Sequence, residues 1–141
     1  MNKISISKAD EREIKSFSKK AWKEADLEHY GPGARWISKE IIFKAVEGGK
    51  IIGTVKAKYD SGVVYIKNVI IAKSKRRQGI GRQLMAKVET VGKKLGAHKV
   101  YLFTGKNWAE RRFYEKLGYG KTADLPKHFF KYDFVIYSKT I

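Results

Sequence analysis

The residues best suited to do chemistry lie between positions 73 and 82, where four cations precede two closely spaced glycines. The cations are Lys73, Lys75, Arg76 and Arg77, and the glycines are Gly79 and Gly81. An apolar pattern typical of a helix follows, and the first amide groups of a helix have no partner within it. Glycine has no Cβ, so an anion could approach these amides closely, and the helix dipole would attract it. The segment predicts a phosphate or pyrophosphate site, and we call residues 76–81 the glycine loop.

A second candidate is the phenol of Tyr114, which stands seven residues after Asn107. Seven residues make two helical turns, so both side chains would project from one face of a helix predicted over residues 107–117. A phenol is protonated at neutral pH and donates a directional hydrogen bond, which suits a general acid. Asn107 also stands three residues before Glu110, a spacing that predicts a helix N-cap.

Other chemistries find little support in the composition. The chain has no cysteine, which excludes a thiol nucleophile or a Cys-ligated zinc, and its three histidines are far apart in sequence. We therefore expect no metal site. A formal net charge of +17 in 141 residues predicts a surface that attracts polyanions.

Two elements must position the glycine loop, a strand before it and a helix after it. Residues 63–71 are nearly all apolar, as in a strand that is covered on both faces. After the loop, residues 79–95 carry apolar side chains at helical spacing and end before Gly96.

The rest of the chain predicts one mixed domain over residues 1–141. A helix begins after Asp10, where Glu13 stands one turn on, and residues 28–35 form a loop around Gly-Pro-Gly. Further strands are expected at residues 4–6, 41–47, 50–59, 100–103 and 132–137. This order indicates an α+β, or mixed α/β, domain in which hairpin strands lead into one strand-helix-strand unit.

Two motifs together resemble the GCN5-related N-acetyltransferase (GNAT) superfamily. The glycine loop, RRQGIG, matches the pattern Arg/Gln-x-x-Gly-x-Gly/Ala, whereas it lacks the third glycine of a Rossmann fingerprint and the Gly-Lys-Ser/Thr of a Walker A loop. Asn107-Trp-Ala109 and the later segment FYEKLGY are similar to the family's N-x-A…Y-E-K-L-G-F/Y segment, with Tyr119 in place of the common Phe.

The resemblance implies a GNAT-like acyl-CoA N-acyltransferase fold, with a central, mostly antiparallel sheet of six or seven strands and about four helices. It also implies a transfer of an acetyl group from acetyl-CoA, as co-substrate, to a primary amine in a ternary complex without a metal. It assigns catalysis to Tyr114, which would protonate the leaving thiolate, and to Asn107. The residues that it assigns to the cofactor are Val69, Ile70, Ile71, Arg76, Arg77, Gln78, Gly79, Ile80, Gly81, Arg82, Asn107 and Tyr114.

The family pattern is incomplete on the strand before the loop. Many members carry a Glu there, but residues 65–68, Tyr-Ile-Lys-Asn, contain no carboxylate. We therefore predict that the amine loses its proton to solvent or to a water relay, with Glu28, His29 and Glu47 as the alternative bases. Lys67 would favour an acceptor with negative charge if its side chain faces the cleft, although a β-bulge would change the direction of this strand's side chains.

The charge leaves a different class of function open, a basic module that binds nucleic acid or the ribosome. The acceptor could be a small molecule or a protein, and the chain a monomer or a homodimer. The sequence has no signal-peptide pattern and no apolar run of about 20 residues, so we expect a cytoplasmic protein without a membrane segment.

Overall fold

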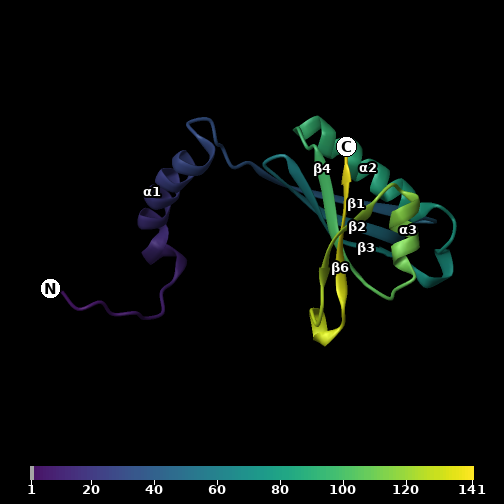
Figure 1. Cartoon of the computed structure of the whole chain (residues 1–141). Helices are drawn as coiled ribbons and strands as arrows, with labels where there is room; N and C mark the ends of the chain where they lie inside the picture. The colour runs from purple at the N-terminus through teal and green to yellow at the C-terminus, as the bar shows by residue number, and fades with distance from the viewer. Residues whose placement is uncertain (1) are drawn as a thin grey trace. The chain divides into compact units, whose positions relative to one another are not determined.

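The computed structural model describes residues 2–141, which fold into three α-helices and one six-stranded sheet (Figure 1). By their contacts these residues divide into two compact units, residues 2–35 and residues 36–141. The first unit contains helix α1 (Glu11–Tyr30). The second contains β1 (Ser38–Glu47), β2 (Lys50–Asp60), β3 (Val63–Ile71), α2 (Ile80–Leu95), β4 (Lys99–Gly105), α3 (Glu110–Lys116), β5 (Gly120–Leu125) and β6 (Phe134–Thr140).

Helix α1 begins where the sequence predicts it. The Asp10 carboxylate accepts a hydrogen bond from the backbone N–H of Glu13 at 3.0 Å, so one free amide of the first turn is satisfied. The helix continues to Tyr30, further than expected, and ends at Gly31 with φ +81°. The strand predicted at residues 4–6 is wrong, because these residues adopt no regular structure.

The sheet has the strand order β1-β2-β3-β4-β6-β5, in which only β3 and β4 run parallel. The mixed, mostly antiparallel fold is thus confirmed, with three helices in place of about four. The six strands are not the six that the pattern gave, because residues 4–6 form none and β5 was not predicted. The sequence does not predict β5 because its residues are at most half-buried, and its segment, GKTADL, shows no alternation of apolar and polar residues.

Helix α2 covers one face of β1, β2 and β3. Its apolar stripe, Leu84, Met85 and Val88, is buried with Val55 and Val64 of the sheet. Gly96 ends the helix in the left-handed conformation, at φ +102°. This packing fixes the N-terminus of α2 at the end of β3, which is where the glycine loop lies.

Candidate functional site

Strands β3 and β4 separate in the middle of the sheet. They pair only where Val63–Tyr65 lies beside Lys99–Tyr101, and the later residues of the two strands, 66–71 and 102–105, do not pair with each other (Figure 1). The second half of β3 therefore has β2 as a neighbour on one side and an opening on the other. Val69, Ile70 and Ile71, which the family resemblance assigns to the cofactor, lie beside this opening.

A β-bulge lies at Lys67, immediately before the opening. Asn68 pairs with Lys56 and Ile66 pairs with Ala57, so Lys67 is an extra residue without a partner on β2. The bulge places Val69 against the core, whereas the Lys67 ammonium lies 3.4 Å from Oε1 of Glu40. The Lys67 charge is thus paired within the protein and does not stand unpaired toward an anionic acceptor.

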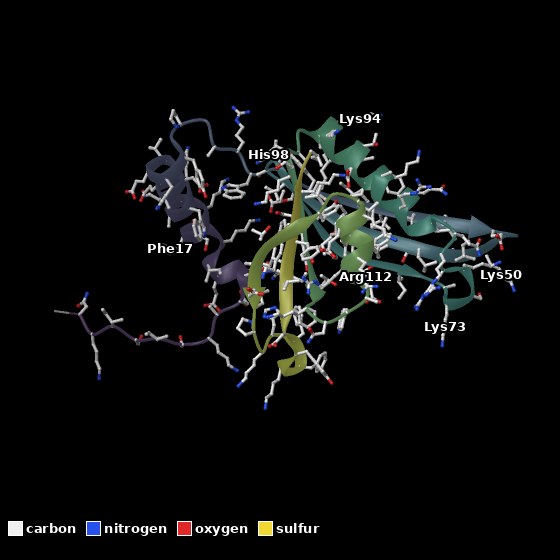
Figure 2. All side chains as sticks on the ribbon, turned by 45° about the vertical axis from the view of Figure 1, so that its right-hand side comes forward. Phe17, Lys50, Lys73, Lys94, His98 and Arg112 are labelled. Carbon is white, nitrogen blue, oxygen red and sulfur yellow. The ribbon has the colours of Figure 1, made fainter. Side chains whose placement is uncertain are left out.

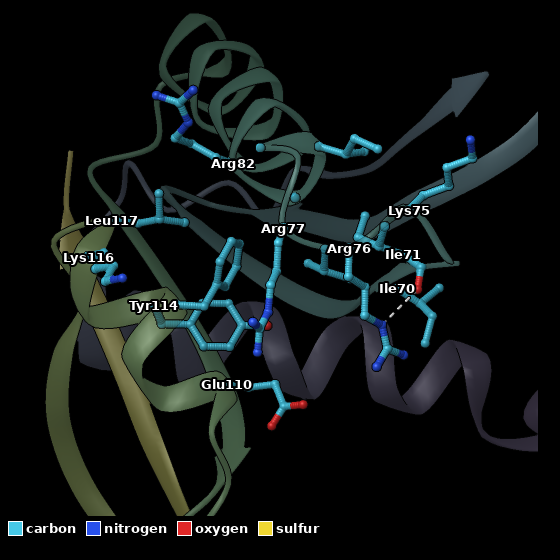
Figure 3. A pocket seen from close by; sticks show the side chains of 15 residues that line it. Ile70, Ile71, Lys75, Arg76, Arg77, Arg82, Glu110, Tyr114, Lys116 and Leu117 are labelled. Carbon is cyan, nitrogen blue, oxygen red and sulfur yellow. Dashed lines mark hydrogen bonds between the residues drawn. The ribbon is translucent and has the colours of Figure 1, made fainter. Parts of the chain in front are cut away.

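The glycine loop turns the chain from β3 into α2 with two residues at positive φ. Arg77 has φ +64° and Gly79 has φ +79°, and Gly79 is the N-cap of α2. Only glycine adopts this conformation without strain, which explains Gly79. Arg76 holds the start of the loop, because its Nε donates a hydrogen bond to the carbonyl oxygen of Ile71 at 3.3 Å (Figure 3).

Gly81 has a different structural reason from the one that the sequence suggests. A Cβ on Gly81 would lie 3.1 Å from Cζ of Phe113, on α3, rather than in open space. The missing side chain therefore lets α3 approach α2. The expectation that Gly81 leaves room for a phosphate at its Cβ position is wrong.

A cavity of about 400 Å³ lies between the glycine loop, the end of β3 and helix α3. Figure 3 shows its side chains, with Arg77 and Tyr114 from opposite walls pointing toward each other. Every residue that we predicted to bind the cofactor lines this cavity except Gln78 and Asn107. The lining residues that the prediction missed are Lys75, Glu110, Phe113, Lys116 and Leu117.

Tyr114 sits on the α3 wall with its ring partly buried against Phe113 and Tyr119, whose ring centroids are 5.0 and 6.1 Å away. Burial raises the pKa of the phenol above its usual value, and the negative charge of Glu110 raises it further. The hydroxyl is therefore protonated at neutral pH and faces a cavity, as a proton donor requires.

Helix α3 begins three residues later than predicted, at Glu110, with Ala109 as its N-cap residue and no side-chain cap. Asn107 thus precedes the helix, is exposed, and does not share a helical face with Tyr114. The predicted Asn107 cap is wrong. Trp108 explains the late start, because its ring packs on the backbone of Gly105, the last residue of β4, and against Phe134, which holds residues 106–109 outside the helix.

None of the predicted bases, Glu28, His29 and Glu47, is among the residues that line the cavity. Glu47 forms an ion pair with Lys75, and Nδ1 of His29 lies 2.7 Å from the carbonyl oxygen of Ala25. Among the residues that line the cavity, Glu110 carries the only carboxylate. It stands one helical turn before Tyr114, a spacing that could have drawn attention to it in the sequence.

Residues 2–141 contain no candidate for a metal site or for a membrane-spanning helix. No three His, Asp or Glu side chains are grouped so that they could hold a metal ion. None of the three helices combines the length and apolar character that a membrane span needs.

Comparisons with known proteins agree with this geometry. An acetyltransferase from Bacillus cereus shares the fold with a TM-score of 0.79 and 20% identity over 98% of both chains. A GNAT family acetyltransferase from Elizabethkingia anophelis, solved with acetyl-CoA bound, aligns with a TM-score of 0.66 and 22% identity over 72% of this chain and 76% of its own.

The ribosomal-protein-S18-alanine N-acetyltransferase from Escherichia coli aligns with a TM-score of 0.64 and 21% identity over 78% of this chain and 72% of its own. No curated protein sequence matches the chain significantly. The model of the acetyltransferase (GNAT) family, however, matches residues 7–119, most of the chain. With this match and the shared fold, the chain belongs to the GNAT acetyltransferase family.

Proposed function

We propose that the protein transfers an acetyl group from acetyl-CoA to a primary amine by direct attack in a ternary complex. One observation carries the proposal: a single cavity has the glycine loop on one wall and the Tyr114 phenol on the other, beside the opening between β3 and β4. An acyl transfer needs its donor held at the phosphates and its leaving group protonated at the other end, and these two walls supply both.

The pyrophosphate of the cofactor would lie on the glycine loop. The backbone amides at the start of α2 and the side chains of Arg77 and Arg82 would receive its charge, and both arginines line the cavity. The pantetheine arm would pass along Val69, Ile70 and Ile71, where β3 has no neighbour on one side. Backbone N–H groups there can donate to the arm and to the oxygen of the thioester.

Tyr114 would then protonate the sulfur as the C–S bond breaks. Its raised pKa keeps the proton on the oxygen until the thiolate forms. The acceptor nitrogen attacks from the side of the opening. Asn107 does not line the cavity, so it would contribute to the reaction only indirectly, through the position of residues 106–109 before α3.

We also propose that residues 1–141 form one N-acetyltransferase domain that acts in the cytoplasm. The family match supports a single domain, because it runs from residue 7 to residue 119 and so crosses the boundary between the two compact units.

The rival proposal, a nucleic-acid or ribosome-binding module, draws on the positive surface. Figure 2 shows Lys50, Lys73, Lys94 and Arg112 extending outward from the ribbon. The chain has 31 Lys and Arg residues against 14 Asp and Glu residues, so ion pairs cannot neutralise its positive charge. A polyanion could bind this surface in addition to the cofactor.

Thermal unfolding distinguishes the two proposals. We expect acetyl-CoA to raise the Tm and to keep this effect at moderate salt, whereas an oligonucleotide should lose its effect as salt displaces phosphate contacts. A free-thiol assay with small amines, polyamines and peptides with free N-termini then identifies the acceptor class. An oligonucleotide shift without any acetyl-CoA shift would contradict the acetyltransferase proposal.

A further inference from the structure

Glu110 is an unusual group for a cavity that otherwise carries positive charge. Lys75, Arg76, Arg77, Arg82 and Lys116 contribute cations to the lining, and Glu110 contributes the one carboxylate. A carboxylate weakens the binding of a polyanionic ligand, so its presence here calls for a different role. Cofactor binding does not explain it.

The Glu110 carboxylate is also not occupied by an ion pair. Within residues 2–141, Glu40, Glu47 and Glu89 each lie within ion-pair distance of a lysine, and Glu110 forms no such pair. Glu110 stands one helical turn before Tyr114 on α3, and both residues line the cavity (Figure 3). Burial raises the pKa of the Tyr114 phenol, and the negative charge of Glu110 raises it further, as expected of neighbours one turn apart.

We propose that the Glu110 carboxylate is the catalytic base of this site and takes the proton that the acceptor ammonium must lose before attack. The inference rests on the proposed acetyl transfer and assigns a carboxylate base, which residues 65–68 on β3 do not provide. Because Tyr114 protonates the leaving sulfur, a group beside it also lies near the thioester carbon, within reach of the incoming amine directly or through one water.

The protons and bonds then balance. One proton passes from the ammonium nitrogen to Glu110, and the neutral nitrogen bonds to the carbonyl carbon. The C–S bond breaks, and the Tyr114 hydroxyl gives its proton to the sulfur. The second proton of the nitrogen restores the phenol through water, and Glu110 releases its proton to solvent. The products are the amide, the free thiol of CoA and one proton.

The charged and titratable groups that line the cavity with Glu110 fit this role. Tyr114 lies on the same helix and Arg77 comes from the glycine loop, and Lys116 lines the same cavity. The two cations can stabilise the carboxylate between turnovers. When the pyrophosphate binds, the arginine gains a competing anionic partner, which leaves Glu110 to receive the cationic acceptor.

The test compares Glu110→Gln with Glu115→Gln, a control on the same helix that is exposed like Glu110 but does not line the cavity. The probes are glycinamide and n-butylamine, which differ in basicity. We expect kcat/KM for each amine to fall about 10²–10⁴-fold in Glu110→Gln. Glu110→Asp should recover part of the loss, Glu115→Gln should match the wild type, and acetyl-CoA affinity should stay equal or increase.

The pH profile separates a base from a merely structural residue. With Glu110 as base, kcat/KM of the wild type rises with pH through an inflection that is common to both amines, and in Glu110→Gln the inflection follows the pKa of each amine. If the wild type acetylates neither amine, the hydrolysis of bound acetyl-CoA, in which water is the nucleophile, is compared in the same variants with the same expected loss.

Unchanged turnover in Glu110→Gln, or a loss that arises from weaker acetyl-CoA binding, would overturn the inference. So would a wild-type inflection that follows the amine, as the sequence alone predicts. These results leave the proposed function intact, which fails separately if the wild type neither binds acetyl-CoA nor consumes it.

Discussion

The two walls of the cavity are built in different ways. The glycine-loop wall depends on the backbone, with Arg77 and Gly79 at positive φ and the start of α2, Ile80 and Gly81, in the cavity lining. The α3 wall depends on side chains, with Phe113, Tyr114 and Glu110 on one face of a seven-residue helix. One wall is suited to hold a charged ligand, and the other to move protons. Variants on the two walls should therefore fail in different measurements.

The largest effect is expected at the hydroxyl of Tyr114. Tyr114→Phe keeps the packing against Phe113 and Tyr119 but removes the proton donor, so kcat should fall roughly 10–10⁴-fold with little change in acetyl-CoA affinity. Steady-state kinetics and calorimetric binding check this. Tyr132→Phe, on a side chain that is 67% exposed, is the control. Wild-type turnover in Tyr114→Phe would show that the α3 wall does not supply the proton for the leaving sulfur.

An intermediate effect is expected at Gly81, where the walls touch. Gly81→Val places a branched side chain against the ring of Phe113, which should lower the free energy of unfolding by about 1–3 kcal/mol and weaken acetyl-CoA binding. Denaturant unfolding and the acetyl-CoA thermal shift measure the two effects. Gly120→Val is the control, because a Cβ there meets nothing within 4 Å.

The double variant Gly81→Val with Phe113→Leu sharpens this result. If the cost comes from packing between α2 and α3, the smaller side chain should restore part of the stability. A double variant as unstable as Gly81→Val alone would show that the glycine is needed for a reason other than the approach of Phe113.

The smallest effect is expected where the walls are tied together. The Tyr119 hydroxyl donates to Oε2 of Glu89, on α2, at 2.9 Å, and Lys139 lies 2.9 Å from the other carboxylate oxygen. Tyr119→Phe removes one hydrogen bond to a charged group but leaves the ion pair, so the free energy of unfolding should fall by about 1–2 kcal/mol. Denaturant unfolding at neutral pH measures it.

The same hydroxyl also predicts a pH dependence. Burial and the nearby Glu89 raise the pKa of Tyr119 far above its usual value, so the folded state favours the protonated phenol. This contribution to stability is complete below the unfolded pKa of about 10 and is lost as pH rises toward the folded value. The wild type should therefore lose more stability above pH ~10 than Tyr119→Phe. Equal losses in the two proteins would contradict the assignment.

The sequence predicts the parts of this molecule that are marked by strong periodicity or by glycine. β3 was predicted with its observed ends, and α2 to within one residue, because both have long apolar patterns between clear boundaries. The glycine loop was predicted as a unit because its glycines report a backbone requirement. The strand at residues 4–6 was wrong because a short alternating pattern forms a strand only with a partner, and none pairs with it.

The α3 wall shows what the pattern could not supply. Asn107 and Glu110 have the spacing of a cap, yet the packing of Trp108 on Gly105 delays the helix. This tertiary contact outweighs the local preference. The spacing pairs Glu110 with Asn107, whereas in the structure Glu110 lies one turn before Tyr114 on α3, because the start of the helix decides which side chains share a face.

The short contact between β3 and β4 also has a consequence for the enzyme without its substrate. Past Tyr65 and Tyr101, the backbone N–H and C=O groups that β3 and β4 direct toward each other have no partner on the facing strand. Such unpaired groups normally occur at the outer edge of a sheet, but here they lie in its middle. A bound cofactor arm would cover these groups, so acetyl-CoA would serve as a missing strand as well as a reactant. Amide hydrogens of residues 67–71 should then exchange with solvent more slowly when acetyl-CoA is present, and depletion of the cofactor would leave the protein more prone to aggregation through this gap.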